Sequence, residues 1–108
     1  MTKKQKVKLV REAYYNFPEA SASLRCVGWK YDEFKFTFID DEEEPAKRYT
    51  VTLSKALRGL DLFMAAVEGG MLPGLGLSAA YKTDTGEWDG SAFDALNQMA
   101  IFGEVIYG

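Results

Sequence analysis

The sequence contains no histidine and only one cysteine, Cys26, and these shortages exclude several kinds of chemistry. Ser-His-Asp triads and Cys-His pairs need a histidine as the base. A lone cysteine cannot form an intramolecular disulfide, a Cys-x-x-Cys redox motif or the common zinc sites, which take several cysteine and histidine ligands. The acids, lysines and tyrosines that remain show no spacing typical of a catalytic set. We therefore expect no enzymatic activity, no cofactor and no bound metal.

Long apolar runs are missing as well. No stretch approaches the ~20 apolar residues that a helix needs to cross a bilayer. Residues 1–11 are charged and have no apolar run behind them, so they do not resemble a secretory signal. A chain without such a signal, and with a single unpaired cysteine, is typical of a reducing compartment. We expect a cytoplasmic protein with no membrane contact.

The residues that are present are sufficient for a compact core. Of the 108 residues, 47% are hydrophobic and 14% are aromatic, which is far from the composition of a disordered chain. The length is close to the commonest size of a protein domain. We expect residues 1–108 to form a single small domain.

The formal net charge of −3 conceals a gradient along the chain. Residues 1–11 carry five basic side chains and no acid, whereas residues 59–108 carry one basic residue and seven acids. A basic start can bind phosphates of a nucleic acid, with an affinity that salt weakens. The candidate polyanion contacts are Lys3, Lys4, Lys6, Lys8 and Arg11. The alternative is a solvated helix end, which the negative charge of the whole chain favours.

Apolar periodicity predicts a helix at the start of the chain. Residues 2–16 repeat apolar side chains at helical spacing, and Pro18 then ends the run. Residues 18–27 fit either a short helix, with the proline at its first position, or a strand. We favour the helix for this segment.

Two segments alternate apolar and polar residues, as strands with one buried face do. They are residues 34–39, with phenylalanine at every second position, and residues 49–53. The acidic, proline-containing residues 40–45 predict the connection of an antiparallel hairpin. Because a two-stranded sheet is only marginally stable, we expect residues 29–31 to lengthen the first strand or add a third. The fold class that follows is α+β: an antiparallel β-hairpin or small three-stranded sheet packed against three to four helices.

Two further helices are expected after the hairpin. Residues 55–68 follow Ser54 as an N-cap, and residues 91–107 begin with Ser91 and Asp94 as a capping box. The first of these helices carries an apolar stripe formed by Leu53, Leu57, Leu60, Met64 and Val67, with Phe63 on its flank.

Residues 69–90 hold six of the ten glycines and are expected to form a long loop. Within it, residues 74–79 fit a Gly-x-Gly-x-x-Ala dinucleotide pattern, but no strand precedes them. Asp84, Glu87 and Asp89 offer carboxylates, but the closing acid of a calcium loop is missing. Ordinary turn chemistry explains the aspartates and glycines of the second motif without a metal.

Two apolar segments exceed what a small core needs. Residues 71–77 are more hydrophobic than an exposed loop normally is, and residues 91–107 are apolar almost all round. Such a helix is either buried centrally or shared with a partner. The candidate interface residues are Met71, Leu72, Leu75, Leu77, Phe93, Leu96, Met99, Ile101, Phe102, Val105, Ile106 and Tyr107.

These surfaces predict a protein that binds rather than one that catalyses. We expect a small cytosolic protein-interaction or regulatory domain that self-associates as a homo-oligomer or binds a protein partner. The alternative is a weak nucleic-acid-binding accessory protein that uses the basic N-terminal helix.

Overall fold

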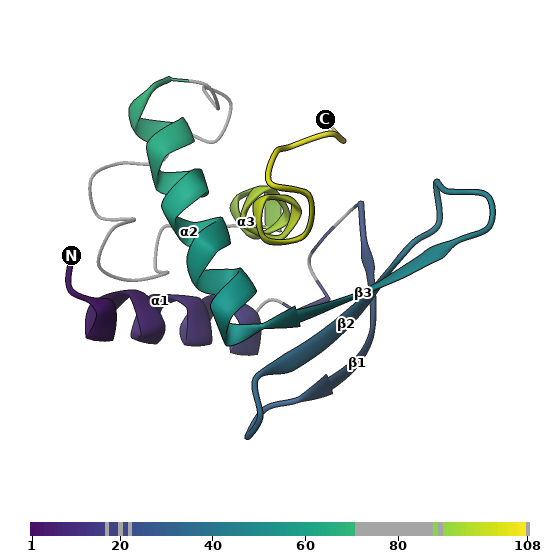
Figure 1. Cartoon of the computed structure of the whole chain (residues 1–108), viewed down its shortest axis with the longest axis horizontal. Helices are drawn as coiled ribbons and strands as arrows, with labels where there is room; N and C mark the ends of the chain where they lie inside the picture. Colours follow the sequence, from purple (N-terminus) through teal and green to yellow (C-terminus); the bar gives the residue numbers. More distant parts are fainter. Residues whose placement is uncertain (17, 20, 22, 71–87, 89, 108) are drawn as a thin grey trace.

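The computed structural model describes residues 1–16, 18, 19, 21, 23–70, 88 and 90–107. These residues form α1 (Lys3–Asn16), β1 (Arg25–Lys30), β2 (Lys35–Asp40), β3 (Lys47–Thr52), α2 (Leu53–Glu68) and α3 (Gly90–Phe102). The sheet is antiparallel with strand order β1-β2-β3. Figure 1 shows the helices toward one end of the long axis and the sheet toward the other. The predicted α+β class is therefore confirmed, with a sheet of three strands.

One face of the sheet supplies a large part of the core. Phe36, Phe38 and Val51 are fully buried, and β2 pairs with β3 so that Phe36 stands opposite Val51. Thr37 and Thr50 stand opposite each other on the other face and remain accessible to solvent. The hairpin predicted from the alternating residues is confirmed, since the register places every second side chain against the helices.

The helix favoured for residues 18–27 was wrong. Residues 25–27 belong to β1, which pairs with β2 from Arg25 opposite Ile39 to Lys30 opposite Lys35. Val27 lies at a break in this register. The partners of Arg25 and Cys26 lie 14 and 12 residues further along the chain, so the local signals of Pro18 and the small residues after it could not reveal this part of the strand.

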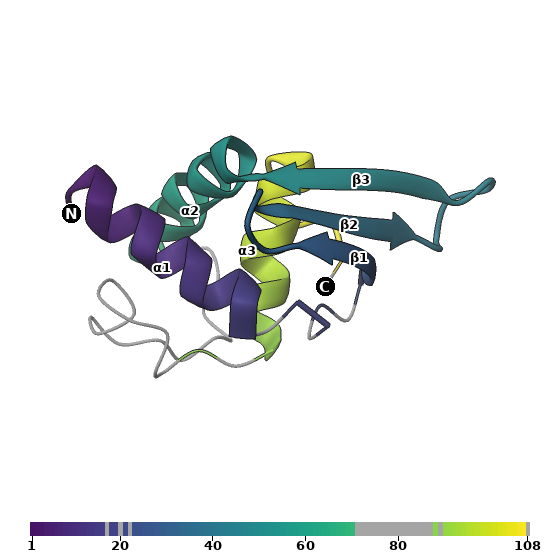
Figure 2. The same cartoon turned by 90° about the horizontal axis from the view of Figure 1, so that it is seen from below.

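Tyr14 links α1 to the sheet and to α3 at the centre of the core. Its ring centroid lies 5.4, 5.1 and 4.9 Å from the ring centroids of Phe34, Phe36 and Phe93. Its hydroxyl donates a hydrogen bond of 2.8 Å to the Oδ1 atom of Asn97. Burial raises the pKa of the Tyr14 hydroxyl well above its usual range, so this group stays a neutral donor. Figure 2 shows α1 in front of α2 and α3, beside the end of the sheet.

Helix α2 begins two residues earlier than expected and has a different N-cap. Thr52 is the N-cap, and its Oγ1 atom accepts a hydrogen bond from the Lys55 N–H at 3.4 Å. Ser54 therefore lies within the helix. Thr52 ends β3, so one residue both closes the strand and caps the helix.

The buried face of α2 is also rotated from the expected stripe. Its buried residues are Ala56, Gly59, Leu60, Phe63 and Ala66, whereas Leu57, Met64 and Val67 are only half-buried. Three of the five buried residues are small. The expected stripe was defined by large side chains, so it did not include these small residues. Phe63 belongs to the core and packs against the Trp88 ring at 5.1 Å.

Helix α3 is the central helix. Eight of its 13 residues are buried. It ends at Phe102 and not at Tyr107, because Gly103 adopts a φ of 79° and its N–H donates to the Met99 carbonyl at 3.0 Å. Of the two interpretations of this apolar helix, central burial accounts for most of its residues.

The capping box expected from Ser91 and Asp94 is wrong. Gly90 is already helical, and the Asp94 carboxylate accepts hydrogen bonds from the side chains of Ser21, Ser23 and Gln98. These contacts fasten the segment before β1 onto α3. The sequence spacing suited a cap, but the two serine partners lie 71 and 73 residues away along the chain, and the third, Gln98, lies one turn later in the same helix.

Helices α2 and α3 are in close backbone contact at Gly59. A Cβ atom at this position would lie 2.7 Å from the backbone Cα and N atoms of Ala100. No side chain larger than hydrogen fits there without a shift of the helices, so Gly59 sets their separation.

We predict that Gly59→Ala destabilises the protein, although alanine is normally the better helix former by about 0.5–1 kcal/mol. The clash with the Ala100 backbone should lower the free energy of unfolding by about 1–3 kcal/mol. Urea unfolding followed by circular dichroism measures this change. Gly28→Ala is the matched control, because a Cβ atom there meets nothing within 4 Å, and its effect should stay within about 0.5 kcal/mol. A Gly59→Ala protein as stable as the parent would contradict the close approach.

Candidate functional site

An apolar groove of about 520 Å³ lies between the C-terminal half of α2 and the end of α3. We call it the α2–α3 groove, and it is lined by Leu62, Ala65, Ala66, Met99, Gly103, Glu104 and Val105. Leu62 is 37% exposed, although leucine is usually buried. Small residues at three of the lining positions make the hollow, and larger apolar side chains stand around it.

The side of the groove formed by residues after α3 is held in place by Gln98. The Oε1 atom of Gln98 accepts hydrogen bonds of 2.9 Å from the N–H groups of both Ile106 and Tyr107. Its Nε2 atom donates to the Tyr107 carbonyl at 3.0 Å. Gly103 turns the chain back, and Gln98 then fixes its path, so that Val105 faces the groove.

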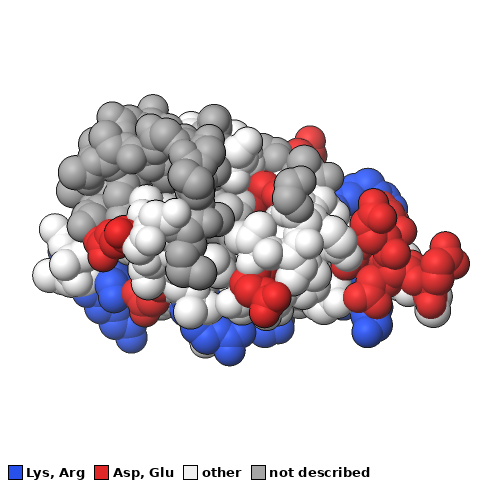
Figure 3. All heavy atoms as spheres, turned by 90° about the horizontal axis from the view of Figure 1, so that it is seen from above, with Lys and Arg blue, Asp and Glu red and all other residues white. Residues whose placement is uncertain are grey.

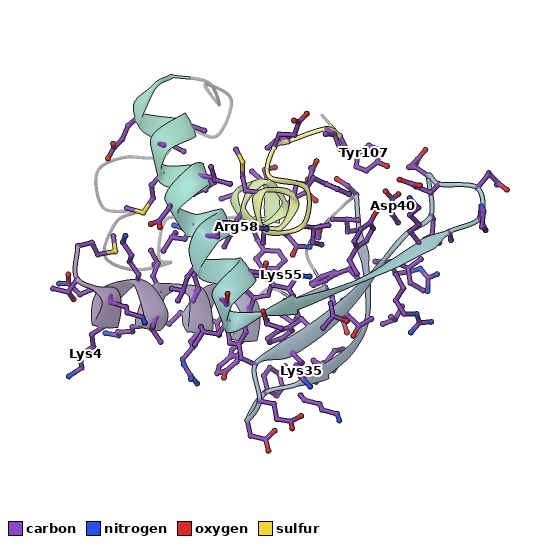
Figure 4. All side chains as sticks on the ribbon, viewed as in Figure 1. Lys4, Lys35, Asp40, Lys55, Arg58 and Tyr107 are labelled. Carbon is purple, nitrogen blue, oxygen red and sulfur yellow. The ribbon has the colours of Figure 1, made fainter. Side chains whose placement is uncertain are left out.

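The same segment is tied to the sheet through Tyr107. Its hydroxyl donates a hydrogen bond of 2.6 Å to the Oδ2 atom of Asp40, at the end of β2. Figure 4 shows the two side chains next to each other. The hydrogen bond from the neutral hydroxyl to the Asp40 carboxylate raises the pKa of Tyr107 to about 12, and burial adds to this effect. The phenol therefore remains a donor at neutral pH.

Part of the interface predicted from the sequence belongs to the core instead. Phe93 and Leu96 are fully buried, so they are not available to a partner on the surface. Phe102 and Ile101 are half-buried, and the Phe102 ring packs against Tyr49 and Tyr107 with centroids 5.4 and 6.1 Å away. These contacts arise because α3 is surrounded by the other elements, which its apolar sequence alone does not specify.

Other predicted interface residues do reach the surface. Val105 lines the α2–α3 groove, and Ile106 is 46% exposed. Met99 borders the groove, but it is only 7% exposed and belongs to the core. Tyr107 is half-buried and engaged by Asp40 and Gln98. The predicted positions Met71, Leu72, Leu75 and Leu77 lie outside the described residues, as do the loop acids Asp84, Glu87 and Asp89.

Sequence reasoning missed Leu62 and Ala65. Both lie on the exposed side of α2, with Arg58 one turn before Leu62 and two turns before Ala65. The apolar stripe expected to face the core runs through the large apolar residues of this helix, and Leu62 lies outside it. Its place outside that stripe was the only sign in the sequence, and the fold shows that Leu62 is exposed beside a hollow.

The predicted polyanion contacts do not all lie on one surface. Lys6 faces α2, where its Nζ atom pairs with Asp61 at 2.7 Å. Lys3 and Lys4 are exposed and have no side-chain partner among the residues that the structure describes. The structure therefore separates Lys6 from the other cations.

Lys4, Lys8 and Arg11 share the outer face of α1 with Tyr15. All four line an open hollow of about 590 Å³ along the helix. The Arg11 Nη1 atom donates to the Tyr15 hydroxyl at 3.1 Å, and Lys8 lies 3.9 Å from Glu12. Spacings of four, three and four residues bring these side chains onto one face.

A polar hollow next to β1 offers hydroxyl and thiol groups but no catalytic arrangement. Ser21, Ser23 and Cys26 line it, and both serine hydroxyls donate to Asp94. The Asp94 oxygens also accept from the Ser23 N–H and from Gln98, so they hold the fold together. Burial raises the pKa of the Cys26 thiol, which keeps it protonated and a poor nucleophile.

Within the described part of the chain, no three histidine, cysteine or acidic side chains gather closely enough to hold a metal ion. Among the described helices, none combines the length and apolar character needed to cross a membrane. A scan of protein-family models, a search of curated proteins and a search of solved structures each found no match to the chain. The function must therefore be argued from the surfaces themselves.

We predict that the Tyr107 hydrogen bond stabilises the fold at neutral pH and loses this effect in alkali. The folded protein keeps the Tyr107 proton up to a pH of about 12, whereas the unfolded chain releases it near the ordinary value of 10.0. The contribution of this hydrogen bond to the free energy of unfolding is therefore complete below pH 10 and decreases as the pH rises from 10 to about 12. Urea unfolding of the parent and of Tyr107→Phe over this range tests it, since the other titrating groups are common to both. A stability difference that does not change with pH would contradict the assignment.

Proposed function

We propose that the protein is a small interaction domain that self-associates, and that two copies meet across the α2–α3 groove. The observation that carries the proposal is this groove, where an exposed leucine stands beside a hollow lined by small residues. Exposed apolar patches of this kind mark association sites more often than scattered surface leucines do. A cytoplasmic location suits the proposal, because the single thiol has no second cysteine to pair with.

The chemistry of the groove favours a protein over a small molecule. Small-molecule sites combine apolar walls with several polar groups that fix the orientation of the ligand. Here Glu104 is the one charged side chain among the lining residues, and it is exposed. The other lining residues offer contact area without directional hydrogen bonds from their side chains. Apolar side chains of a partner fill such a surface.

A second copy of this chain is the partner that the surface fits best. Two-fold dimers bring the same patch of each copy together, so the patch must carry both projections and hollows. Leu62 is the projection, and Ala65, Ala66 and Gly103 form the hollow next to it. A two-fold axis near the middle of α2 places each leucine over the hollow of the other copy.

The charges of α2 support this arrangement. Lys55 and Arg58 lie in its N-terminal half and Glu68 lies at its C-terminal end, whereas Asp61 is paired with Lys6 of α1. Figure 4 shows the two basic residues on this helix. Two α2 helices related by the axis run antiparallel, which brings the basic N-terminal half of one copy toward the C-terminal end of the other, where Glu68 lies. Opposite charges around an apolar centre favour this pairing over a parallel one.

We predict that the parent protein dimerises reversibly at micromolar concentrations and that Leu62→Glu weakens the dimer at least about tenfold. An unpaired carboxylate buried at the centre of the interface costs more than the ~1.4 kcal/mol that a factor of ten represents. Sedimentation velocity over a concentration series measures the dissociation constant, and circular dichroism shows whether the variant is folded.

Val27→Glu serves as the matched control, because Val27 on β1 is exposed to the same 37% as Leu62 but lies outside the groove. This variant should dimerise like the parent. A parent protein that stays monomeric throughout the series would refute the proposal. So would a folded Leu62→Glu protein that dimerises as tightly as the Val27→Glu control.

A further inference from the structure

A second surface, on the opposite side of α1 from the core, combines positive charge with exposed aromatic rings. Lys4, Lys8 and Arg11 form a line along the outer face of α1. Seven residues of helix separate the first from the last, which corresponds to ~10 Å. Figure 4 shows Lys4 directed away from the body of the protein. This line of cations ends at Tyr15.

The cations are joined to the aromatic rings by a chain of contacts. Arg11 donates to the Tyr15 hydroxyl, which in turn donates to the Tyr31 carbonyl at 2.7 Å. The Tyr15 and Tyr31 ring centroids are 4.9 Å apart, and those of Tyr31 and Trp29 are 6.3 Å apart. These contacts connect α1 to the end of β1, so the charges and the rings belong to one surface.

The rings on this surface are unusually accessible. Trp29 is 43% exposed and Tyr31 is 39% exposed. Large aromatic side chains normally contribute their area to the core, as the Phe34 and Phe36 rings do here. Tyr31 also packs against Phe36, with ring centroids 5.8 Å apart, so each of the two neighbouring rings offers only its exposed part for stacking.

We propose that this surface, formed by Lys4, Lys8, Arg11, Tyr15, Tyr31 and Trp29, binds a single-stranded nucleic acid. Phosphates lie along the cations of α1, and unpaired bases stack on Tyr31 and Trp29. Single strands offer both a negative backbone and free base faces, which is the combination that a basic groove with aromatic platforms recognises. An acidic peptide matches the charges but has no bases for the rings. Paired bases of a duplex do not expose their faces.

The charge distribution over the molecule is compatible with this proposal despite the net charge of −3. Figure 3 shows acidic atoms gathered at one end of the molecule, and the β2–β3 connection occupies this end in Figure 1. Residues 41–44 supply four acids there. Helix α1 begins at the opposite end. The acidic end repels a nucleic acid and directs it toward α1.

Carboxylates near the binding surface limit the expected affinity. Glu12 lies 3.9 Å from Lys8, and Glu33 lies 3.7 Å from Lys30 beside the aromatic rings. All four side chains of these pairs are partly or largely exposed, so each pair is weak and a phosphate can replace the carboxylate. We expect weak binding that depends strongly on salt.

The test is the binding of a fluorescent oligothymidylate of ~10 nucleotides, within the range of common single-strand site sizes. Fluorescence anisotropy at several salt concentrations gives the affinity and the slope of its logarithm against the logarithm of salt concentration. In Lys4→Gln/Lys8→Gln, the slope should become smaller by ~1.4, because each phosphate contact contributes ~0.7 for a single strand. Trp29→Ala should weaken binding about tenfold with the slope unchanged, because it removes stacking and no charge.

The matched control is Lys47→Gln/Arg48→Gln, which removes the same charge from β3 at the acidic end. This variant should keep the slope of the parent. No binding at low salt, or an equal change of slope in both double variants, would overturn the proposal. Equal affinity for a duplex of the same sequence, or equal competition by polyglutamate, would also overturn it. Either of these last two results would show that the surface recognises negative charge alone and that the aromatic rings do not take part.

Discussion

The close approach of α2 and α3 at Gly59 and Ala100 is the constraint on which the rest of the structure depends. It places α3 at the centre, where Asn97 meets α1 through Tyr14, and Gln98 holds the residues that follow the helix. A wider crossing would move both contacts and would change the walls of the α2–α3 groove. The buried polar side chains of α3 thus fix the positions of α1 and of the residues after α3, while the apolar side chains of α3 belong to the core.

Signals that lie within a few residues of one another were sufficient to predict α1 and the β2–β3 hairpin. A third strand was expected around residues 29–31, but the first part of β1 was assigned to a helix. Pro18 and the small residues after it favoured that helix, whereas Arg25 pairs with Ile39, 14 residues further along the chain. The face of α2 was misplaced for another reason. Small residues such as Ala56 and Gly59 give no hydrophobic signal, yet they determine which side of the helix can approach α3.

The functional surfaces were predictable to different degrees. The spacing of Lys4, Lys8 and Arg11 already places these cations on one helical face. Their continuation into exposed rings depends on how α1 meets the end of β1, which no local pattern contains. For the last helix, an apolar sequence fits both a core and an interface equally well. Burial assigns Phe93 and Met99 to the core and leaves the half-buried Val105, which follows the helix, at the groove.

The two tryptophans of the chain stand in contrasting surroundings, and each gives a separate optical signal. Trp88 is 6% exposed and packs against Phe63, whereas the Trp29 indole is open to solvent. A soluble quencher such as iodide reaches the second and not the first. The blue-shifted part of the emission therefore reports on the integrity of the core, and the quenchable part reports on what occupies the outer surface. The protein carries its own pair of probes for telling loss of structure apart from binding.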